Sequence, residues 1–417
     1  MMKIATACRS CGGTNLTRVL DLGRTALADR LLTEAMLAEE EPVFPLTVWY
    51  CSACSLVQIR EQVAPEILFG DLYQYFSSFS DALLRHSRDN AERLIEQRRL
   101  GPGSLVVELA SNDGYMLKNF KAWGIPVLGI DPAPGPAKAA IAAGIDTMMT
   151  FFTRDLARQL RSEGRAADVI IANNVLAHVP DLNGFVEGIG ILLKEDGVAV
   201  IEAPYVKDLI EHCEFDTIYH QHLCYFSISA LRHLFARHGL HLNHVMHLPI
   251  HGGSLRLFVE KRPAPSPQLQ AMLEAEVAAG VVTPEYYLDF AKRVEAIKTD
   301  LLNLLKELKA NGKRIAAYGA AAKGCTLLNY TGIGPETLDF VVDRNIHKHG
   351  RYMPGRHVPI RPVEQLLTEM PDYTLLLAWN FADEIISQQA AYVQRGGRFI
   401  VPVPTPRVAE PERMMVA

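Results

Sequence analysis

From residue 104 onward, short apolar runs alternate with longer amphipathic stretches. Four such runs are 104–110 (SLVVELA), 126–131 (PVLGID), 168–176 (DVIIANNVL) and 197–205 (GVAVIEAPY). Nearly continuous apolar runs of strand length, separated by helical patterns, are typical of parallel strands buried on both faces. The pattern therefore predicts an α/β domain whose ligands bind beside the carboxyl ends of the strands.

The residues at those strand ends indicate the ligand. Glu108 precedes a small-residue turn, and only Gly114 is available there, so the three-glycine fingerprint of dinucleotide sites is absent. An acidic residue, a small turn and a glycine suit a cationic ligand without phosphate, and Asp131 is placed to hold a ribose diol. We therefore predict S-adenosylmethionine as the cofactor; the alternative is that Asp131 is a solvated turn residue. The predicted cofactor residues are Glu108, Asn112, Gly114, Asp131, Pro132, Asn173 and Asn174.

Four of the seven cysteines form two C-x2-C pairs near the N-terminus, Cys8 with Cys11 and Cys51 with Cys54. Two such pairs supply the four sulfurs of a closed tetrahedral zinc site, which predicts a structural Zn²⁺. The alternative is a redox dithiol, but that motif opens a helix of a thioredoxin-like unit, whereas these pairs lie among short strand patterns.

Composition and charge limit the number of domains, the partners and the location that we expect. The 417 residues are 49% hydrophobic, which is enough chain for two or three packed domains. The net charge of −5 gives no basic excess, so we expect no nucleic-acid partner. Without an apolar run of about 18 residues or a signal-peptide pattern, we expect a cytoplasmic protein with no membrane partner, acting as a monomer.

Several motifs together resemble the nucleotide-sugar C-methyltransferases, enzymes that make branched deoxysugars. Besides the cysteine pairs they are 108–120 (ELASNDGYMLKNF), 173–185 (NNVLAHVPDLNGF), 218–227 (IYHQHLCYFS) and 251–256 (HGGSLR). The resemblance spans nearly the whole chain. It implies an α/β protein with a small N-terminal zinc-binding module, a central class I (Rossmann-like) methyltransferase domain and a C-terminal Rossmann-like domain.

The expected domain boundaries follow from these motifs. We place the zinc-binding module at 1–65 and the methyltransferase domain at 66–262. A helical linker and the Rossmann-like nucleotide-sugar domain take 263–417. The implied substrate is a nucleotide-diphosphate 4-keto-deoxysugar, methylated at a carbon next to the ketone (C3 or C5).

Methylating carbon requires a base, because carbon becomes nucleophilic only after the proton beside a carbonyl is removed. The resemblance implies His222 as this base. It also implies that Tyr219 and His178 steady the substrate or the enolate oxygen. The family's glutamate is Gln221 here, which can orient a histidine by hydrogen bonding but cannot supply charge. The predicted catalytic residues are His222, Tyr219, His178, Tyr73, Tyr75 and Gln221.

The C-terminal part holds the predicted substrate site. In 313–324 (KRIAAYGAAAKG) a strand enters a small-residue turn before a helix, which suits a phosphate at the helix N-terminus. The alternatives are a solvated basic loop there and, for Arg256, a charged strand end. The predicted substrate-binding residues are Ser254, Arg256, Lys323, Asp343, Lys348, Arg351 and Tyr352.

Two other functions compete with this assignment. A nicotinamide-dependent keto-sugar reductase would also suit two Rossmann-like halves, although the missing three-glycine turn argues against it. A non-catalytic zinc-ribbon binding protein with an inactive methyltransferase domain is the second alternative, and Gln221 favours it modestly.

Overall fold

The computed structural model describes residues 2–68 and 76–409, so Tyr73 and Tyr75 lie outside the described residues. The chain divides into two compact units, each taken by itself below. Unit 1 comprises Met1–Thr17, Tyr50–Val206 and Leu223–Thr283, and unit 2 comprises Arg18–Trp49, Lys207–His222 and Pro284–Ala417. Among the described residues, no helix is both long and apolar enough to cross a bilayer.

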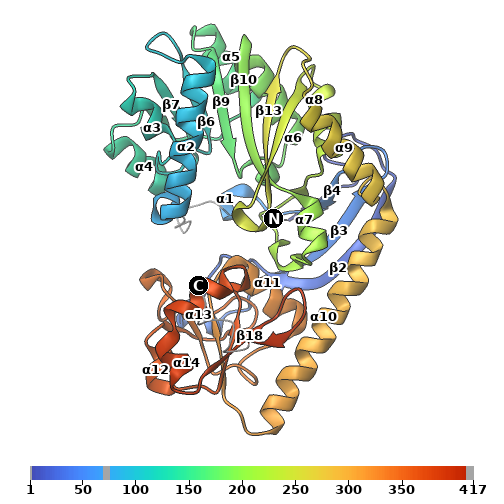
Figure 1. Cartoon of the computed structure of the whole chain (residues 1–417), viewed down its shortest axis with the longest axis vertical. Helices are drawn as coiled ribbons and strands as arrows, with labels where there is room; N and C mark the ends of the chain where they lie inside the picture. Colours follow the sequence, from blue (N-terminus) through green and yellow to red (C-terminus); the bar gives the residue numbers. More distant parts are fainter. Residues whose placement is uncertain (1, 69–75, 410–417) are drawn as a thin grey trace. The chain divides into compact units, whose positions relative to one another are not determined.

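Unit 1 is built on a seven-stranded sheet (Figure 1), in the order β12-β13-β10-β9-β6-β7-β8. The strands are β6 (Val106–Leu109), β7 (Val127–Ile130), β8 (Thr147–Met148), β9 (Ala167–Asn173), β10 (Leu193–Pro204), β12 (His241–Leu248) and β13 (Ser254–Glu260). Neighbours from β8 to β10 run parallel, while β13 is antiparallel to both β10 and β12. The strand order reverses between β6 and β9, which is where ligands bind in such sheets.

Helices flank this sheet (Figure 1), and each has buried residues. They are α2 (Asp81–Arg98), α3 (Leu117–Ala122), α4 (Pro134–Ala142), α5 (Arg154–Ser162), α6 (Leu182–Leu192) and α8 (Ile228–Ala236). α2 begins where the Ser80 side chain accepts a hydrogen bond from the Leu83 amide, and it ends at Arg99 in the left-handed region. Its Leu94 joins Phe120 of α3 in one buried apolar cluster with the strands.

The N-terminal module of unit 1 consists of very short strands. β1 (Lys3–Ile4) pairs antiparallel with β5 (Glu61–Gln62). β4 (Val57–Ile59) pairs antiparallel with β11 (Cys224–Tyr225), which begins two residues after His222 in the chain.

Unit 2 contains a second sheet, in the order β16-β15-β14-β17-β18-β19. Its strands are β14 (Ile315–Tyr318), β15 (Val341–Asp343), β16 (Ile360–Pro362), β17 (Tyr373–Leu376), β18 (Arg398–Val401) and β19 (Arg407–Val408). The flanking helices are α11 (Ala322–Thr331), α12 (Gln365–Glu369), α13 (Ala382–Gln388) and α14 (Ala390–Gln394). Read in chain order, this is the 3-2-1-4-5-6 order of Rossmann folds, so the predicted fold class is confirmed for both sheets.

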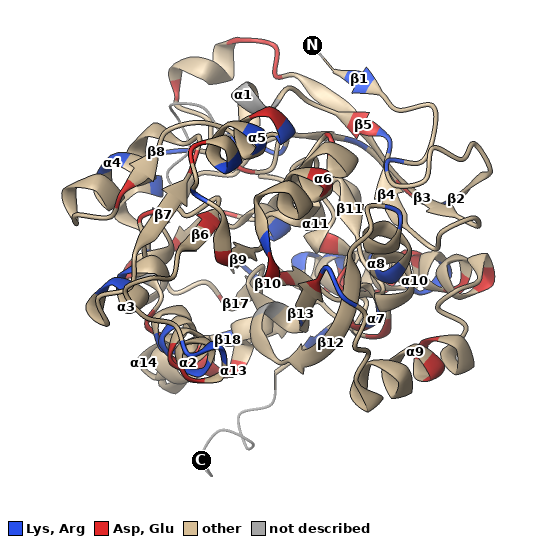
Figure 2. Cartoon of the chain, turned by 90° about the horizontal axis from the view of Figure 1, so that it is seen from above, with Lys and Arg blue, Asp and Glu red and all other residues tan. Residues whose placement is uncertain are grey.

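The remaining elements connect these sheets. Most of β2 (Leu16–Ala26) and most of its neighbour β3 (Val43–Cys51) belong to unit 2. Two further helices, α1 (Pro65–Leu68) and α7 (Val206–Glu211), are short. The predicted linker is two helices, α9 (Pro267–Ala279) in unit 1 and α10 (Pro284–Ala310) in unit 2. Basic and acidic residues are interspersed on the elements (Figure 2).

Candidate active site and metal centre

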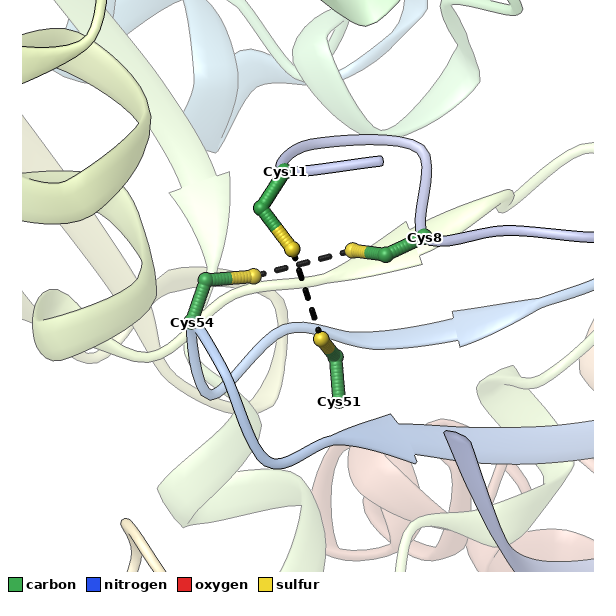
Figure 3. Close-up of side chains that lie close together, drawn as sticks. All are labelled: Cys8, Cys11, Cys51 and Cys54. Carbon is green, nitrogen blue, oxygen red and sulfur yellow. Dashed lines mark hydrogen bonds between the residues drawn. The ribbon is translucent and has the colours of Figure 1, made fainter. Parts of the chain in front are cut away.

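The four cysteines of the two C-x2-C pairs converge on one point (Figure 3). The Sγ atoms of Cys8 and Cys54 are 3.6 Å apart, those of Cys11 and Cys51 are 3.5 Å apart, and all four lie within 4.8 Å of one another. Four sulfurs bound to one zinc at about 2.3 Å would be separated by about 3.8 Å, so the arrangement fits a tetrahedral site. All four thiols are free, and none is in a disulfide.

Hydrogen bonds attach this cysteine cluster to the rest of unit 1. The Asn183 side chain, on α6, donates to the carbonyls of Arg9 and Ser10 at 2.9 and 3.0 Å. The fully buried Gln58, in β4, accepts from the Arg9 amide at 2.9 Å. The first cysteine turn is thus held between a methyltransferase helix and the strand that pairs with β11.

At the carboxyl edge of the unit 1 sheet, the loop after β6 has unusual backbone geometry. Ala110, Asn112 and Gly114 all have positive φ, at 55°, 50° and 78°. A Cβ on Gly114 would lie 2.9 Å from the Ile145 side chain, so packing as well as φ requires glycine there. The loop therefore holds its backbone in a fixed, compact turn beside the predicted cofactor position.

Asp131 follows β7 and is firmly held. Its two oxygens accept from the amides of Asn112 and Ala133, both at 2.8 Å. Burial raises the pKa of Asp131 even though these hydrogen bonds favour its ionised form. A carboxylate oxygen has more than one lone pair, so each can accept a further hydrogen bond, as a ribose hydroxyl would require.

Glu108 lies on β6 and is fully buried. Neither of its carboxylate oxygens has a hydrogen-bond partner among residues 2–68 and 76–409. Burial, with the nearby charges of Asp131 and Asp113, raises the pKa of Glu108 well above its ordinary value. A buried acid that lacks a partner is costly unless something supplies a donor or a positive charge.

Other buried oxygens at this edge share that property. In the described part of the chain, the side-chain oxygens Ser111 Oγ, Asp113 Oδ1 and Asn173 Oδ1 have no partner. Asn174 follows at the end of β9 with a φ of +54°, and its amide donates to the Glu202 carbonyl at 2.8 Å. Pro132 is half-buried after Asp131. This oxygen-rich edge suits a cationic ligand with several donor groups, which is the chemistry of S-adenosylmethionine.

In unit 2, residues 219–222 form a turn that brings two predicted catalytic side chains together. The His222 amide donates to the Tyr219 carbonyl at 2.9 Å, which closes the turn. The Tyr219 and His222 rings face each other, with centroids 4.2 Å apart. The Tyr219 hydroxyl lies 3.2 Å from His222 Nε2.

The hydrogen bond at the other ring nitrogen, Nδ1, defines which nitrogen of His222 carries the proton. Nδ1 lies 2.9 Å from the Thr217 carbonyl oxygen, which can only accept, so Nδ1 carries the proton. In the neutral ring Nε2 is then the acceptor, and the Tyr219 hydroxyl donates to it. The turn therefore holds a histidine in the tautomer that a general base needs.

The two middle residues of the turn point to the N-terminal part of unit 2. His220 is fully buried and donates from Nε2 to the Pro45 carbonyl at 2.9 Å, and burial lowers its pKa. Gln221 donates from Nε2 to Asp29 Oδ2 at 3.2 Å. Because this partner is a carboxylate, the amide of Gln221 serves as a donor, which a glutamate ionised at this position could not do.

The other predicted catalytic residues are not part of this turn. His178 ends a short 3-10 helix (Leu176–His178) in unit 1, where it is half-buried. With Tyr73 and Tyr75 outside the described residues, the roles of these three stay predictions.

The predicted phosphate cradle of unit 2 is internally hydrogen-bonded. Asp343 accepts from the amides of Ala320 and Asn345 at 2.7 and 2.8 Å, and Lys348 Nζ donates to the Ala320 carbonyl at 2.8 Å. Tyr352 bridges Leu32 and Pro359 through its backbone. Arg351 is half-buried nearby.

Lys323 lies on the other side of β14. It donates to Asn380 Oδ1 at 3.1 Å, and its Nζ is 4.3 Å from the centre of the Trp379 ring. Asp216 and Glu214 are close enough for the Lys323 charge to lower their pKa values, although burial raises both, that of Glu214 to about 7. The Lys323 ammonium thus interacts electrostatically with two acidic side chains, whether or not it also binds a phosphate.

Arg256 and Ser254 lie in β13 of unit 1, and both are buried. Arg256 Nε donates to Glu202 Oε1 at 2.7 Å, and its NH2 is 3.0 Å from His86 Nε2. The Ser254 hydroxyl donates to the Ile250 carbonyl at 3.1 Å. Both side chains thus have internal partners, and contact with substrate stays a prediction for each.

Comparison with known proteins places this arrangement in a family. Three family descriptions match: "Putative zinc binding domain" over 8–69, "Methyltransferase domain" over 80–245 and "C-methyltransferase C-terminal domain" over 249–404. C-methyltransferase NovU of Streptomyces niveus is 36% identical over 408 residues, covering 97% of each chain. The chain belongs to this C-methyltransferase family.

Other matches cover a smaller share of the chain. Ubiquinone biosynthesis O-methyltransferase of Azorhizobium caulinodans is 25% identical over 122 residues, which are 29% of this chain and 47% of that protein. The crystal structure of magnesium protoporphyrin IX methyltransferase from Synechocystis with bound SAH covers 47% of this C-methyltransferase and 92% of that chain, at 16% identity and a TM-score of 0.35. Family and fold class were both predicted correctly from the sequence.

The sequence alone did not single out several polar residues that lie at or near the candidate sites of this C-methyltransferase. Ser111 and Asp113 stand inside the motif that was used, so the run of polar residues after β6 was a signal that could have found them. His86, Asp216 and Trp379 gave no such signal, because each meets its partner only through long-range folding.

Proposed function

We propose that this protein methylates a nucleotide-diphosphate 4-keto-deoxysugar at a carbon next to the ketone, C3 or C5, with S-adenosylmethionine as donor. The observation that carries the proposal is the Tyr219–His222 pair, with a ring nitrogen held as an acceptor. O-methylation and N-methylation start from atoms that already have lone pairs, whereas C-methylation needs such a base.

The proton-transfer step is assigned to His222. The bond between the α-carbon and its hydrogen breaks, the proton goes to Nε2, and the electron pair forms the enolate. The Thr217 carbonyl stabilises the resulting imidazolium by keeping its hydrogen bond to Nδ1. In the structure the Tyr219 hydroxyl donates to Nε2. During the reaction this hydroxyl either moves away so that the substrate reaches Nε2, or relays the proton from the substrate to Nε2 through its oxygen.

The edge of the unit 1 sheet fits the cofactor. Asp131 has acceptor capacity for the ribose, Asn173 Oδ1 is open on the adenine side, and Glu108 favours a cation. When bound, S-adenosylmethionine supplies the electrophilic methyl group that the substrate carbanion takes. The buried oxygens lacking partners in the described chain would then acquire donors, which offsets the cost of burying them.

The zinc is proposed to be structural. Four thiolates fill a tetrahedral coordination shell and leave no open position for substrate or water. The metal would fix the cysteine turns, and through Gln58 and β4 it would hold β11, which begins two residues after His222.

For the substrate, we propose that the diphosphate is bound by unit 2. Asp343 ends β15, Lys348, Arg351 and Tyr352 follow it, and Lys323 is the second residue of α11. The predicted boundaries (1–65, 66–262 and 263–417), a cytoplasmic location and a monomeric state remain part of the proposal.

Turnover tests the proposal directly. Purified protein should convert S-adenosylmethionine to S-adenosylhomocysteine only with a nucleotide-diphosphate 4-keto-deoxysugar, and the product should carry a new C-methyl group by mass spectrometry and NMR. Nicotinamide oxidation with the same sugars, measured at 340 nm, would instead support a reductase. Tight binding of S-adenosylmethionine with no turnover on any 4-keto sugar nucleotide would favour the non-catalytic alternative.

A further inference from the structure

A buried carboxylate lies in the segment that leads to Tyr219 and His222. Asp216, in the short 3-10 helix Phe215–Thr217, is fully buried. Trp379 donates from Nε1 to its Oδ2 at 2.7 Å. The other oxygen, Oδ1, has no hydrogen-bond partner in the described part of the chain. Burying a charged group costs several kcal/mol, so an apolar residue at position 216 would be the cheaper way to fill this space.

The surroundings of Asp216 favour its charged form. Burial raises its pKa, while the Lys323 charge, the Trp379 hydrogen bond and the backbone amides of Asp216 and Thr217 lower it. Lys323 is fixed in turn by Asn380 Oδ1 and by the face of the Trp379 ring. Three segments distant in sequence thus meet at one carboxylate, all of them in unit 2.

Asp216 directly precedes the peptide that orients His222. The Thr217 amide and hydroxyl both donate to the Glu214 carbonyl, at 3.0 and 2.7 Å, so Thr217 is fixed beside the anchored Asp216. On the next residue, the Ile218 carbonyl accepts from Thr326 Oγ1 at 3.0 Å. The Thr217 carbonyl, lying between these anchors, is the acceptor for His222 Nδ1 at 2.9 Å.

We propose that Asp216 and Trp379 are positioning residues: they fix the Thr217 carbonyl and thereby keep His222 in the tautomer that accepts a proton at Nε2. Neither side chain touches the reacting atoms in this assignment. The inference rests on the proposed role of His222 as base, and it adds residues that the sequence motifs do not indicate.

The first test replaces Trp379 with phenylalanine, which keeps an aromatic face for Lys323 but removes the Nε1–H donor. The matched control is Trp123→Phe, because Trp123 is a 64% exposed residue at the end of α3 in unit 1. We expect Trp379→Phe to slow solvent exchange of the substrate α-proton by about 10- to 100-fold, because misplaced catalytic groups lose rates of this order. S-adenosylhomocysteine affinity should stay within about twofold, and the control should behave as wild type.

A second readout does not depend on activity. In protein with ¹⁵N-labelled histidine, assigned by comparison with His222→Ala, the ring nitrogen shifts report which nitrogen carries the proton. Wild type should show the Nδ1–H form, and Trp379→Phe a mixture. Asp216→Asn keeps an oxygen that accepts from Trp379, so it should lose less exchange activity than Asp216→Ala. Asp216→Ala, which removes the same hydrogen bond, replaces Trp379→Phe if that variant does not fold.

The outcomes separate this inference from the proposed function. If Trp379→Phe, or Asp216→Ala in its place, keeps both the wild-type exchange rate and the wild-type ring spectrum, the positioning role is wrong. If His222→Ala exchanges the proton normally while Trp379→Phe still changes the His222 ring spectrum, the base is misassigned but the positioning role stands. Equal losses in Trp379→Phe and Trp123→Phe would also overturn the positioning role.

Discussion

The two sheets share the same kind of strand order but differ at their carboxyl edges. In unit 1, Glu108, Ser111 and Asn173 present buried oxygens that have no partner in the described chain. In unit 2, Asp343 and Lys348 at the equivalent edge are both bonded to Ala320, although the buried Tyr318 hydroxyl at the end of β14 has no partner in the described chain. A Rossmann-like topology therefore creates a place for a ligand, but the side chains decide whether that place is kept open.

One aspartate at the carboxyl end of the second strand of each sheet, β7 and β15, allows a direct comparison of the two edges. Asp131 and Asp343 each accept two backbone amide hydrogens, at 2.7 to 2.8 Å. Near Asp131, the carboxylate oxygens of Glu108 have no donor in the described chain, whereas beside Asp343 the ammonium of Lys348 lies 3.4 Å away. Similar local geometry would thus serve a cofactor in one unit under the proposed function, whereas in the other it contributes, at least in part, to the fold itself.

The largest expected effect concerns the proposed zinc, whose four cysteines all lie in unit 1. Cys51→Ser removes one of four sulfurs, and since structural zinc supplies much of the folding free energy of small modules, the N-terminal module should unfold. Metal analysis should fall from about one zinc per chain to near zero. Hydrogen exchange should rise in β4 and β11 but not in β14 and β17. A folded, metal-free variant would contradict the structural assignment.

Asp131→Ala should have the next largest effect, on cofactor binding. Losing an acceptor for a ribose hydroxyl should weaken S-adenosylmethionine binding by about 1.5 to 3 kcal/mol. Isothermal titration measures this, with circular dichroism as the check on folding. Unchanged affinity in a folded variant would remove Asp131 from the ribose site.

Glu108 gives a pH dependence with a definite sign. Its pKa is raised by burial and by the charges of Asp131 and Asp113, so at pH values just above its ordinary pKa the folded protein holds a proton that the unfolded chain has lost. The stability this contributes is complete below the ordinary pKa and is lost as the pH rises through the raised value. A bound cation favours the ionised acid, so cofactor binding should release a proton.

Affinity for S-adenosylmethionine should therefore increase with pH, by at most about tenfold per unit, until Glu108 is ionised without ligand. Titration in buffers with different ionisation enthalpies should detect the released proton. Glu108→Gln should remove both the proton release and the slope. The same slope in Glu108→Gln would assign the effect to another group.

The smallest expected effect is that of Asp343→Ala on cofactor binding. Affinity for S-adenosylmethionine should change by less than about twofold, although the loss of two backbone hydrogen bonds should lower the melting temperature. Parallel titrations of Asp131→Ala and Asp343→Ala make this a matched pair. A similar loss of cofactor affinity in both would mean that the two sheet edges do not differ in function.

The sequence was most informative where a site is local. The two C-x2-C spacings suffice to predict four converging sulfurs, and an acid after an apolar strand suffices to place Asp131 at a sheet edge. It was least informative where partners lie far apart. Trp379 and Asp216 are separated by 163 positions, and His86 and Glu202 by 116, so no spacing rule connects them. Gln221 could be interpreted only after Asp29 was seen as its acceptor.

The central claim, that His222 removes the proton beside the ketone, is tested most directly by solvent exchange. The 4-keto sugar nucleotide is incubated with enzyme and S-adenosylhomocysteine in deuterated water, and NMR follows loss of the α-proton, which isolates deprotonation from methyl transfer. We predict that His222→Ala lowers this rate by about 10²- to 10⁴-fold while cofactor affinity is unchanged. Exchange at the wild-type rate in His222→Ala, with abolition in Tyr219→Phe or His178→Ala, would contradict the account.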